Sequence, residues 1–203
     1  MDYRAILDRI LHTVDCDAYL TPSSQVDPAQ RDAVALVERA LQRDGFNPDA
    51  VRALILQLHE EGRMDRVLML SSLHVVAAHP AVADYGEAAR LAGEQELAAL
   101  ELGGPNLNAN LASADRHRGV VAFLRGHTVI ALDYFSRALE RERSAENLGN
   151  VLCSLIRLGE VEDARSLLTQ IAHAYPRTVV AQLRDRIERD PDLALLRGEE
   201  YDA

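Results

Sequence analysis

The sequence contains no lysine and no tryptophan, and only 4% of its 203 residues are aromatic. All 22 basic residues are therefore arginine. The absence of lysine excludes mechanisms that need its side-chain amine, such as Schiff-base chemistry or a phosphate-binding loop built on lysine. Codon usage in a GC-rich genome explains this composition better than a general demand for guanidinium chemistry does.

Long apolar runs are also missing. None approaches the ~18–20 residues that a membrane-spanning helix needs, and residues 1–4 lack the order of basic, apolar and small residues that marks a signal peptide. The two cysteines, Cys16 and Cys153, are too few for a disulfide framework. These absences predict a cytoplasmic protein with no membrane-inserted segment.

Acidic residues outnumber basic ones by 32 to 22, which gives a net charge of −10 and a pI of about 5.1. This balance argues against nucleic acid or an anionic membrane as the main partner. The surplus is concentrated in residues 1–113, which hold 17 acidic residues and 9 arginines. An acidic surface of this kind would steer a basic partner toward the protein.

The hydrophobic pattern predicts an all-α fold. Alanine, leucine, arginine and glutamate, which favour helices, dominate the sequence, and patterns typical of strands are nearly absent. Apolar residues spaced three and four apart predict helices over 2–14 and 28–43, and Asn47 followed by Pro48 marks the start of the next helix. Near the C-terminus, residues 179–196 are predicted to form a capping helix with Leu183 facing inward.

Four glycines recur at nearly constant intervals. Gly62, Gly93, Gly126 and Gly159 are separated by 31, 33 and 33 residues. This period fits a helical hairpin in which a glycine ends the first helix, where its backbone adopts a positive φ without a Cβ clash. Because neither helix of such a hairpin covers its own apolar stripe, successive hairpins must stack.

The last two intervals resemble the tetratricopeptide repeat, with the match covering residues 112–178. The residues that carry the resemblance are Gly119, Gly126, Ala131, Phe135 and Ala138 in one unit, and Leu152, Gly159, Ala164, Leu168 and Pro176 in the next. The resemblance implies an α-solenoid of stacked antiparallel hairpins with extra N-terminal helices and a C-terminal capping helix. We therefore expect an N-terminal helical segment over 1–46 and a repeat domain over 47–203, together forming one compact unit.

The resemblance weakens toward the N-terminus. Over 48–80, Ser71 and His74 replace the large and small apolar residues of the family pattern, whose tryptophan is absent throughout. Residues 82–105 either form a degenerate hairpin with Gly93 at its turn or contain one long helix over 82–102. Whether residues 1–44 cap the stack or fill its groove is also open.

In this family the first helix of each hairpin lines a concave groove. The resemblance therefore points to a partner-binding groove formed by Arg52, Leu56, Arg116, His117, Val120, Glu146, Asn150, Cys153 and Arg157. Asparagine and arginine side chains suit the backbone or carboxylate of an extended peptide. Ordinary solvated surface is the alternative interpretation of Arg116, Asn150 and Arg157.

One branch of the family grips the C-terminal carboxylate of chaperone tails with basic residues and asparagines. Here Val120 stands where that branch has an asparagine, and Leu183 and Ile187 occupy the places of its third pair. These departures argue against a chaperone-tail clamp.

No specific catalytic signature is present. The sequence has no phosphate loop, no nucleophile elbow and no His-Glu-x-x-His motif. His12 and Cys16 lie four residues apart, a spacing compatible with two metal ligands, but a helix end with a buried thiol is the better interpretation because no second ligand pair stands out. We expect no catalytic residue, no metal and no cofactor.

These observations predict a non-enzymatic module for protein–protein interaction, acting as an adaptor, scaffold or small chaperone that binds a peptide or helix of a partner protein. In size and charge the chain is similar to the helical-repeat chaperones of bacterial secretion systems. Two alternatives stay open, a regulatory subunit that senses a ligand or metal and a homo-oligomeric assembly factor.

Overall fold

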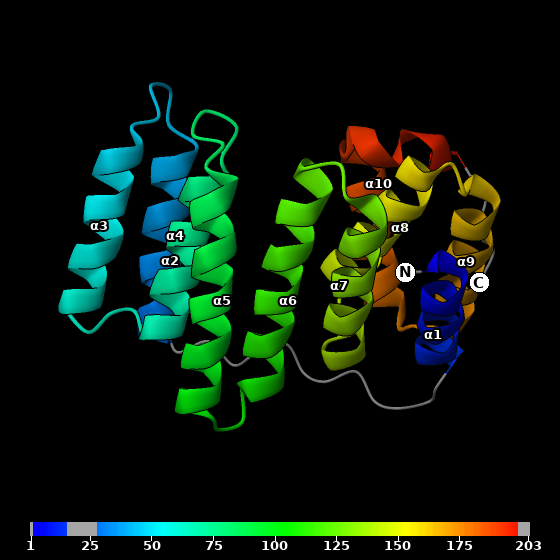
Figure 1. The fold of residues 1–203 in the computed structure, drawn as a ribbon, viewed down its shortest axis with the longest axis horizontal. Coiled ribbons are helices and arrows are strands. Elements are labelled where there is room, and N and C mark those ends of the chain that lie inside the picture. Colours follow the sequence, from blue (N-terminus) through cyan, green and yellow to red (C-terminus); the bar gives the residue numbers. More distant parts are fainter. Residues whose placement is uncertain (1, 16–27, 199–203) are drawn as a thin grey trace. The chain divides into compact units, whose positions relative to one another are not determined.

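In the computed structural model, residues 2–15 and 28–198 are described, and all of their regular secondary structure is helical (Figure 1). This confirms the predicted all-α class. The elements are α1 (Tyr3–Asp15), α2 (Pro28–Leu41), α3 (Pro48–Glu60), α4 (Arg66–Ala78), α5 (Tyr85–Leu102), α6 (Leu107–Leu124), α7 (Thr128–Arg141), α8 (Ala145–Leu158), α9 (Val161–Ala174), α10 (Arg177–Arg189) and the 3₁₀ helix η1 (Pro191–Leu196). Within the described ranges, no helix is long and apolar enough to cross a membrane.

The chain divides into two compact units. Unit 1 combines Met1–Ser23 with Ala122–Ala203, and so contains α1, α7 to α10 and η1. Unit 2 is Ser24–Val121 and contains α2 to α5 with most of α6. Unit 1 is therefore built from two stretches of chain that lie far apart in the sequence.

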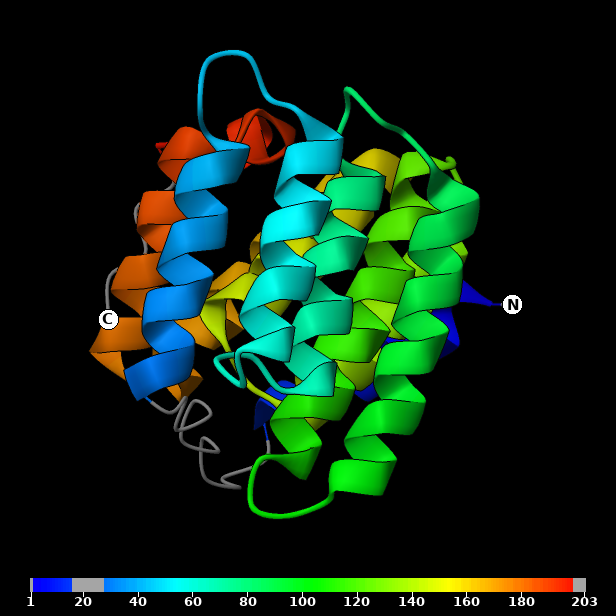
Figure 2. The same ribbon diagram turned by 90° about the vertical axis from the view of Figure 1, so that its left-hand side faces the viewer.

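In unit 2, α2 packs on α3 and α4, α3 packs on α4, and α4 packs on α5. Figure 2 shows α2, α3 and α4 side by side. One apolar cluster joins α2, α3 and α4 around Ile55, which is fully buried. A second joins α4, α5 and α6, where the small side chains of Ala77, Ala88 and Ala99 are fully buried and let the helices approach closely.

In unit 1, α8 lies at the centre. It packs against α7, α9, α10 and η1, and α1 packs against α7 and α9. Every residue of α8 from Asn147 to Leu155 is buried, including Leu148, Leu152 and Leu155, which are fully inaccessible. A helix that is buried on all sides needs partners on all sides, and α7, α9, α10 and η1 are those partners.

Three turns share one backbone arrangement. Gly62, Gly126 and Gly159 each have φ between +71° and +84°. In each turn, the amide of the residue after the glycine donates to a carbonyl in the last turn of the preceding helix: Arg63 to Leu58 at 2.9 Å, His127 to Ala122 at 2.9 Å and Glu160 to Leu155 at 3.0 Å. This is the helix termination that the sequence predicted at these glycines.

Gly93 does not form such a turn. It lies inside α5, which runs without interruption from Tyr85 to Leu102. Of the two interpretations of residues 82–105, the single long helix is confirmed. The positive φ values fall instead on Gly103 and Gly104, directly after that helix.

The predicted ends of several helices are confirmed. Asn47 caps α3, since its side chain accepts hydrogen bonds from the amides of Asp49 and Ala50. The helix predicted over 179–196 is observed as α10 followed by η1, with Leu183 and Ile187 buried. Asp27, which precedes Pro28 of α2 as Asn47 precedes Pro48 of α3, lies outside the described residues.

The contrast between two glycines gives a stability test. We expect Gly126→Val to lower the free energy of unfolding by about 1–3 kcal/mol, because a β-branched residue is strained at φ +79°. Gly93→Ala should instead raise it by up to ~1 kcal/mol, because alanine favours the interior of a helix and a Cβ there meets its nearest atom at an ordinary 3.8 Å. Urea unfolding of the three proteins measures both changes, and effects of the same sign would contradict this assignment of the two glycines.

Candidate functional site

The residues predicted to line a groove fall on three helices, and those on α8 are in contact with α10 and η1. The Arg186 side chain of α10 lies directly over Gly149, where a Cβ atom would come within 2.7 Å of its guanidinium. Its Nη1 donates to the carbonyl oxygen of Glu146 and its Nη2 to Oδ1 of Asn150, both at 2.6 Å. Gly149 thus makes room for an arginine that binds the backbone and a side chain of α8.

The next turn of α8 is covered in the same way. The Sγ atom of Cys153 lies 3.9 Å from Oδ2 of Asp190, and burial, with a smaller contribution from the Asp190 carboxylate, raises the pKa of the thiol to about 12. A thiol with so high a pKa is a poor nucleophile at neutral pH. The residue serves packing between α8 and the C-terminal segment.

Arg157 ends this row of contacts. Its guanidinium lies 3.7 Å from the centre of the Phe123 ring and donates to Oδ1 of Asp192 at 3.2 Å. A guanidinium stacked on an aromatic ring and paired with a carboxylate is held in one orientation. The α8 residues singled out in the sequence therefore hold the chain's own α10 and η1.

On α3, Leu56 is exposed and Arg52 is half-buried. Leu56 is 45% exposed. Arg52 lies one turn earlier and forms a surface ion pair with Asp49 at 3.2 Å. We call these two side chains the α3 face.

On α6 one of the three predicted residues, His117, belongs to a buried polar cluster of unit 2. His117 is only 7% exposed, and its ring stacks on that of His74 with the centroids 4.0 Å apart. The Nδ1 atom of His117 lies 2.7 Å from Oε1 of Gln95, whose Nε2 donates to Oγ of Ser113 at 3.1 Å. His117 is therefore directed into unit 2, whereas Arg116, which donates to Ser113 at 3.4 Å, and Val120 are half-buried.

The hydrogen bonds indicate which ring nitrogen of each histidine acts as a donor. The Gln95 amide nitrogen is used toward Ser113, so its oxygen faces His117 and accepts from Nδ1–H. Likewise Nδ1 of His74 donates to the carbonyl oxygen of Ala88 at 2.9 Å. Both stacked rings thus carry a proton on Nδ1.

Burial lowers the pKa of both histidines. For His74 the bond to the Ala88 carbonyl opposes burial, and the charge of Arg116 adds to the lowering. The pKa of His117 lies well below its usual value because of burial, followed by the neighbouring His74 and Arg116. The cluster therefore favours two uncharged rings at neutral pH.

The metal interpretation of His12 and Cys16 falls partly outside the described residues. His12 is exposed at the end of α1, and Cys16 is not described. Across residues 2–15 and 28–198, no group of three or more His, Cys, Asp or Glu side chains is placed to hold a metal ion.

Sequence reasoning missed Gly149, Arg186, His74 and Gln95. One signal was available for His74, since a histidine replaces a small apolar residue of the repeat pattern there. Gly149 also gave a signal, because a glycine in the middle of a helix costs about 1 kcal/mol and therefore indicates a close approach.

Compared with known proteins, the chain matches no family model, no curated protein and no solved structure.

Gly149→Ala gives a test of the contact with α10. Alanine gains about 1 kcal/mol of helix propensity, but its Cβ displaces Arg186 from two charge-assisted hydrogen bonds worth about 1.5 kcal/mol or more each. We expect a net loss of about 2 kcal/mol or more in the free energy of unfolding. In an Arg186→Ala background the same substitution should be stabilising by about 1 kcal/mol, and the same sign in both backgrounds would remove the proposed role of Gly149.

The buried pair of His74 and His117 is expected to make the folded protein less stable in acid. The unfolded chain binds protons at histidine below about pH 6.5, whereas the folded chain resists protonation of His74 and His117. The contribution of the two histidines to the free energy of unfolding is complete above that pH. It decreases as the pH falls, by up to about 1.4 kcal/mol per pH unit for each histidine. Denaturant unfolding between pH 7.5 and 5 should show a shallower decline for His74→Leu/His117→Leu than for the wild type or for the exposed control His173→Leu. An unchanged slope in the double variant would exclude the pair as the source.

Proposed function

We propose that the protein is a non-enzymatic interaction module that binds a helix or peptide of a partner protein, within a tetratricopeptide-like arrangement of hairpins. The observation that carries this proposal is the correspondence between the open α3 face and the occupied face of α8. Adaptor, scaffold and small chaperone are the roles that such binding would serve.

The corresponding residues of α3 and α8 lie at the same distances before a turn glycine. Arg52 lies ten residues before the turn glycine Gly62, as Gly149 does before Gly159. Leu56 and Cys153 each lie six residues before the same glycines. On α8 these two positions contact Arg186 and Asp190 of the C-terminal segment, so the face of a first helix at this register accepts a helix.

The chemistry of the α3 face differs from that of α8. An arginine replaces the glycine, and a leucine that is 45% exposed replaces the buried cysteine. A partner suited to it would bring an apolar side chain to Leu56 and a carboxylate to Arg52. Such a carboxylate can replace Asp49, because an exposed ion pair with this neighbour is worth at most ~1 kcal/mol.

The experiment compares the proteins that co-purify with three forms of the tagged chain expressed in its native host. The forms are the wild type, Arg52→Glu/Leu56→Asp, and Leu195→Asp, which alters a leucine that is 57% exposed on η1. We expect a partner that is recovered with the wild type and with Leu195→Asp and is depleted about tenfold or more from the double variant, since buried charge in an interface is strongly unfavourable. Circular dichroism should show equal helicity in all three. Equal recovery of every co-purifying protein with the double variant would exclude the α3 face.

A further inference from the structure

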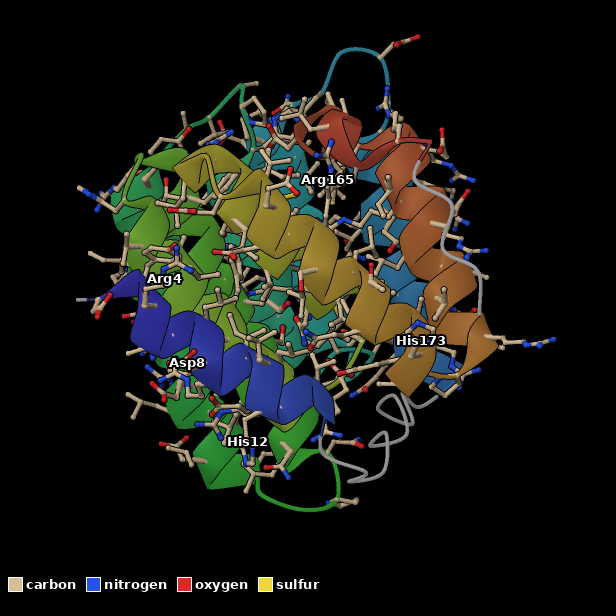
Figure 3. All side chains as sticks on the ribbon, turned by 90° about the vertical axis from the view of Figure 1, so that its right-hand side faces the viewer. Arg4, Asp8, His12, Arg165 and His173 are labelled. Atoms are coloured by element: carbon tan, nitrogen blue, oxygen red, sulfur yellow. The ribbon has the colours of Figure 1, made fainter. Side chains whose placement is uncertain are left out.

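Unit 1 is completed by a helix that precedes all of unit 2 in the sequence. α1 ends at Asp15 and α7 begins at Thr128, and the whole of unit 2 lies between them in the sequence. α1 nevertheless packs on α7 and α9. Figure 3 shows α1 and α9 side by side and running in the same direction, from Arg4 to His12 and from Arg165 to His173.

The contact is that of an amphipathic helix on a complementary surface. Ile6, Leu7, Ile10 and Val14 of α1 are at most 5% exposed, and they form one stripe at helical spacing. The opposite side, which includes Ala5, is exposed. This is the pattern by which an amphipathic helix binds the surface of another protein.

α7 carries a site for one arginine of the bound helix. Nη2 of Arg9 lies 2.7 Å from Oδ1 of Asp133, and its Nε lies 2.8 Å from Oε1 of Glu140 and 3.1 Å from the buried hydroxyl of Ser136. The three acceptors lie on one side of α7, at intervals of three and four residues. Two carboxylates and a hydroxyl directed at one guanidinium make this site selective for arginine.

A second acidic group lies further along, on α9. Oδ2 of Asp163 accepts from the hydroxyl of Tyr3 at 3.3 Å and from Nη1 of Arg4 at 3.2 Å. Together, Asp133, Ser136 and Glu140 of α7 and Asp163 of α9 define what we call the α1-binding face. Its three carboxylates face two arginines of α1.

We propose that the α1-binding face is a docking site for an amphipathic helix of a partner protein, and that α1 occupies it as an internal competitor. The partner helix has aliphatic residues at the positions of Ile6, Leu7, Ile10 and Val14 and an arginine at the position of Arg9. The face belongs to unit 1, so the proposal is independent of the α3 face.

Exchange is feasible because the departure of α1 breaks no backbone hydrogen bond within α7 or α9. The backbone hydrogen bonds of a helix are internal, so its departure exposes side chains but opens no backbone ladder. α1 has only 13 residues, and a helix of that length is marginal when free. Because α1 is tethered to the same chain, its effective concentration is of millimolar order. It therefore competes with partner helices of low affinity, and only a helix of higher affinity displaces it.

The test uses the full-length chain and a fluorescent peptide of residues 2–15 as the probe. Three chains are compared by fluorescence anisotropy: the wild type; Ile10→Asp, which places a charge in the buried stripe; and the matched control Ala5→Asp, which places the same charge on the exposed side. We expect Ile10→Asp to bind the probe about tenfold or more tightly than the other two chains, because its own α1 no longer competes.

A charge reversal then tests the arginine site. A peptide that carries Arg9→Glu should bind the Ile10→Asp protein about tenfold more weakly than the native peptide does. Adding Asp133→Arg to the Ile10→Asp protein should restore binding of the Arg9→Glu peptide. Equal affinity of both peptides for Ile10→Asp overturns the proposal. So does failure of a fully helical Ile10→Asp chain to bind the native peptide. A wild-type dimer formed at micromolar concentration and abolished by Ile10→Asp in light scattering also overturns it, because the occupant would then be α1 of a second copy.

If the Ile10→Asp protein fails to fold, amide hydrogen exchange of the wild type tests the proposal instead. Amides of α1 that exchange at least about tenfold faster than those of α7 and α9 show that α1 opens while the face stays folded. Exchange of α1 at the rate of α7 and α9 shows that it leaves only on unfolding of unit 1, which overturns the proposal.

Discussion

A helix cannot cover its own apolar stripe, and each described unit depends on how this constraint is met. α8 meets it completely, since α7, α9, α10 and η1 surround it and its central residues are inaccessible. α1 meets it by packing on α7 and α9. α3 meets it only on the sides that pack against α2 and α4, which leaves Leu56 exposed. The proposed binding surfaces follow from this difference in coverage.

Arginine chemistry refines the contacts within unit 1. Arg186 reaches two acceptors on α8 only because Gly149 has no side chain in its path. Arg157 combines ring stacking with an ion pair, and Arg9 combines two carboxylates with a hydroxyl. A planar guanidinium with several donors suits these contacts, whereas an ammonium would lose part of each of them. In a chain without lysine, packing makes repeated use of the one available cation.

Local structure was predictable from the sequence to the extent that it is encoded locally. Residues within one or two helical turns determine where α3 begins, at Asn47–Pro48, and where the chain turns, at Gly62, Gly126 and Gly159. Long-range pairing was not predictable, because the stripe of α1 gives no information about which distant helices it joins. The sequence likewise singled out Asn150 and Cys153 for the first-helix face but could not show that α10 and η1 cover them. His117 carried no sign that its ring stacks on His74, because that contact depends on the packing of α4 and α6 around Gln95.

The discontinuous origin of unit 1 has a consequence during synthesis. α1 leaves the ribosome before unit 2, but α9, against which it packs, is complete only about 160 residues later, a delay of roughly ten to thirty seconds at ~5–20 residues per second. For that interval the nascent chain exposes the stripe of Ile6, Leu7, Ile10 and Val14 while all of unit 2 is translated. Throughout this interval α1 is open to capture by other factors, and it is covered only when α7 and α9 have been synthesised.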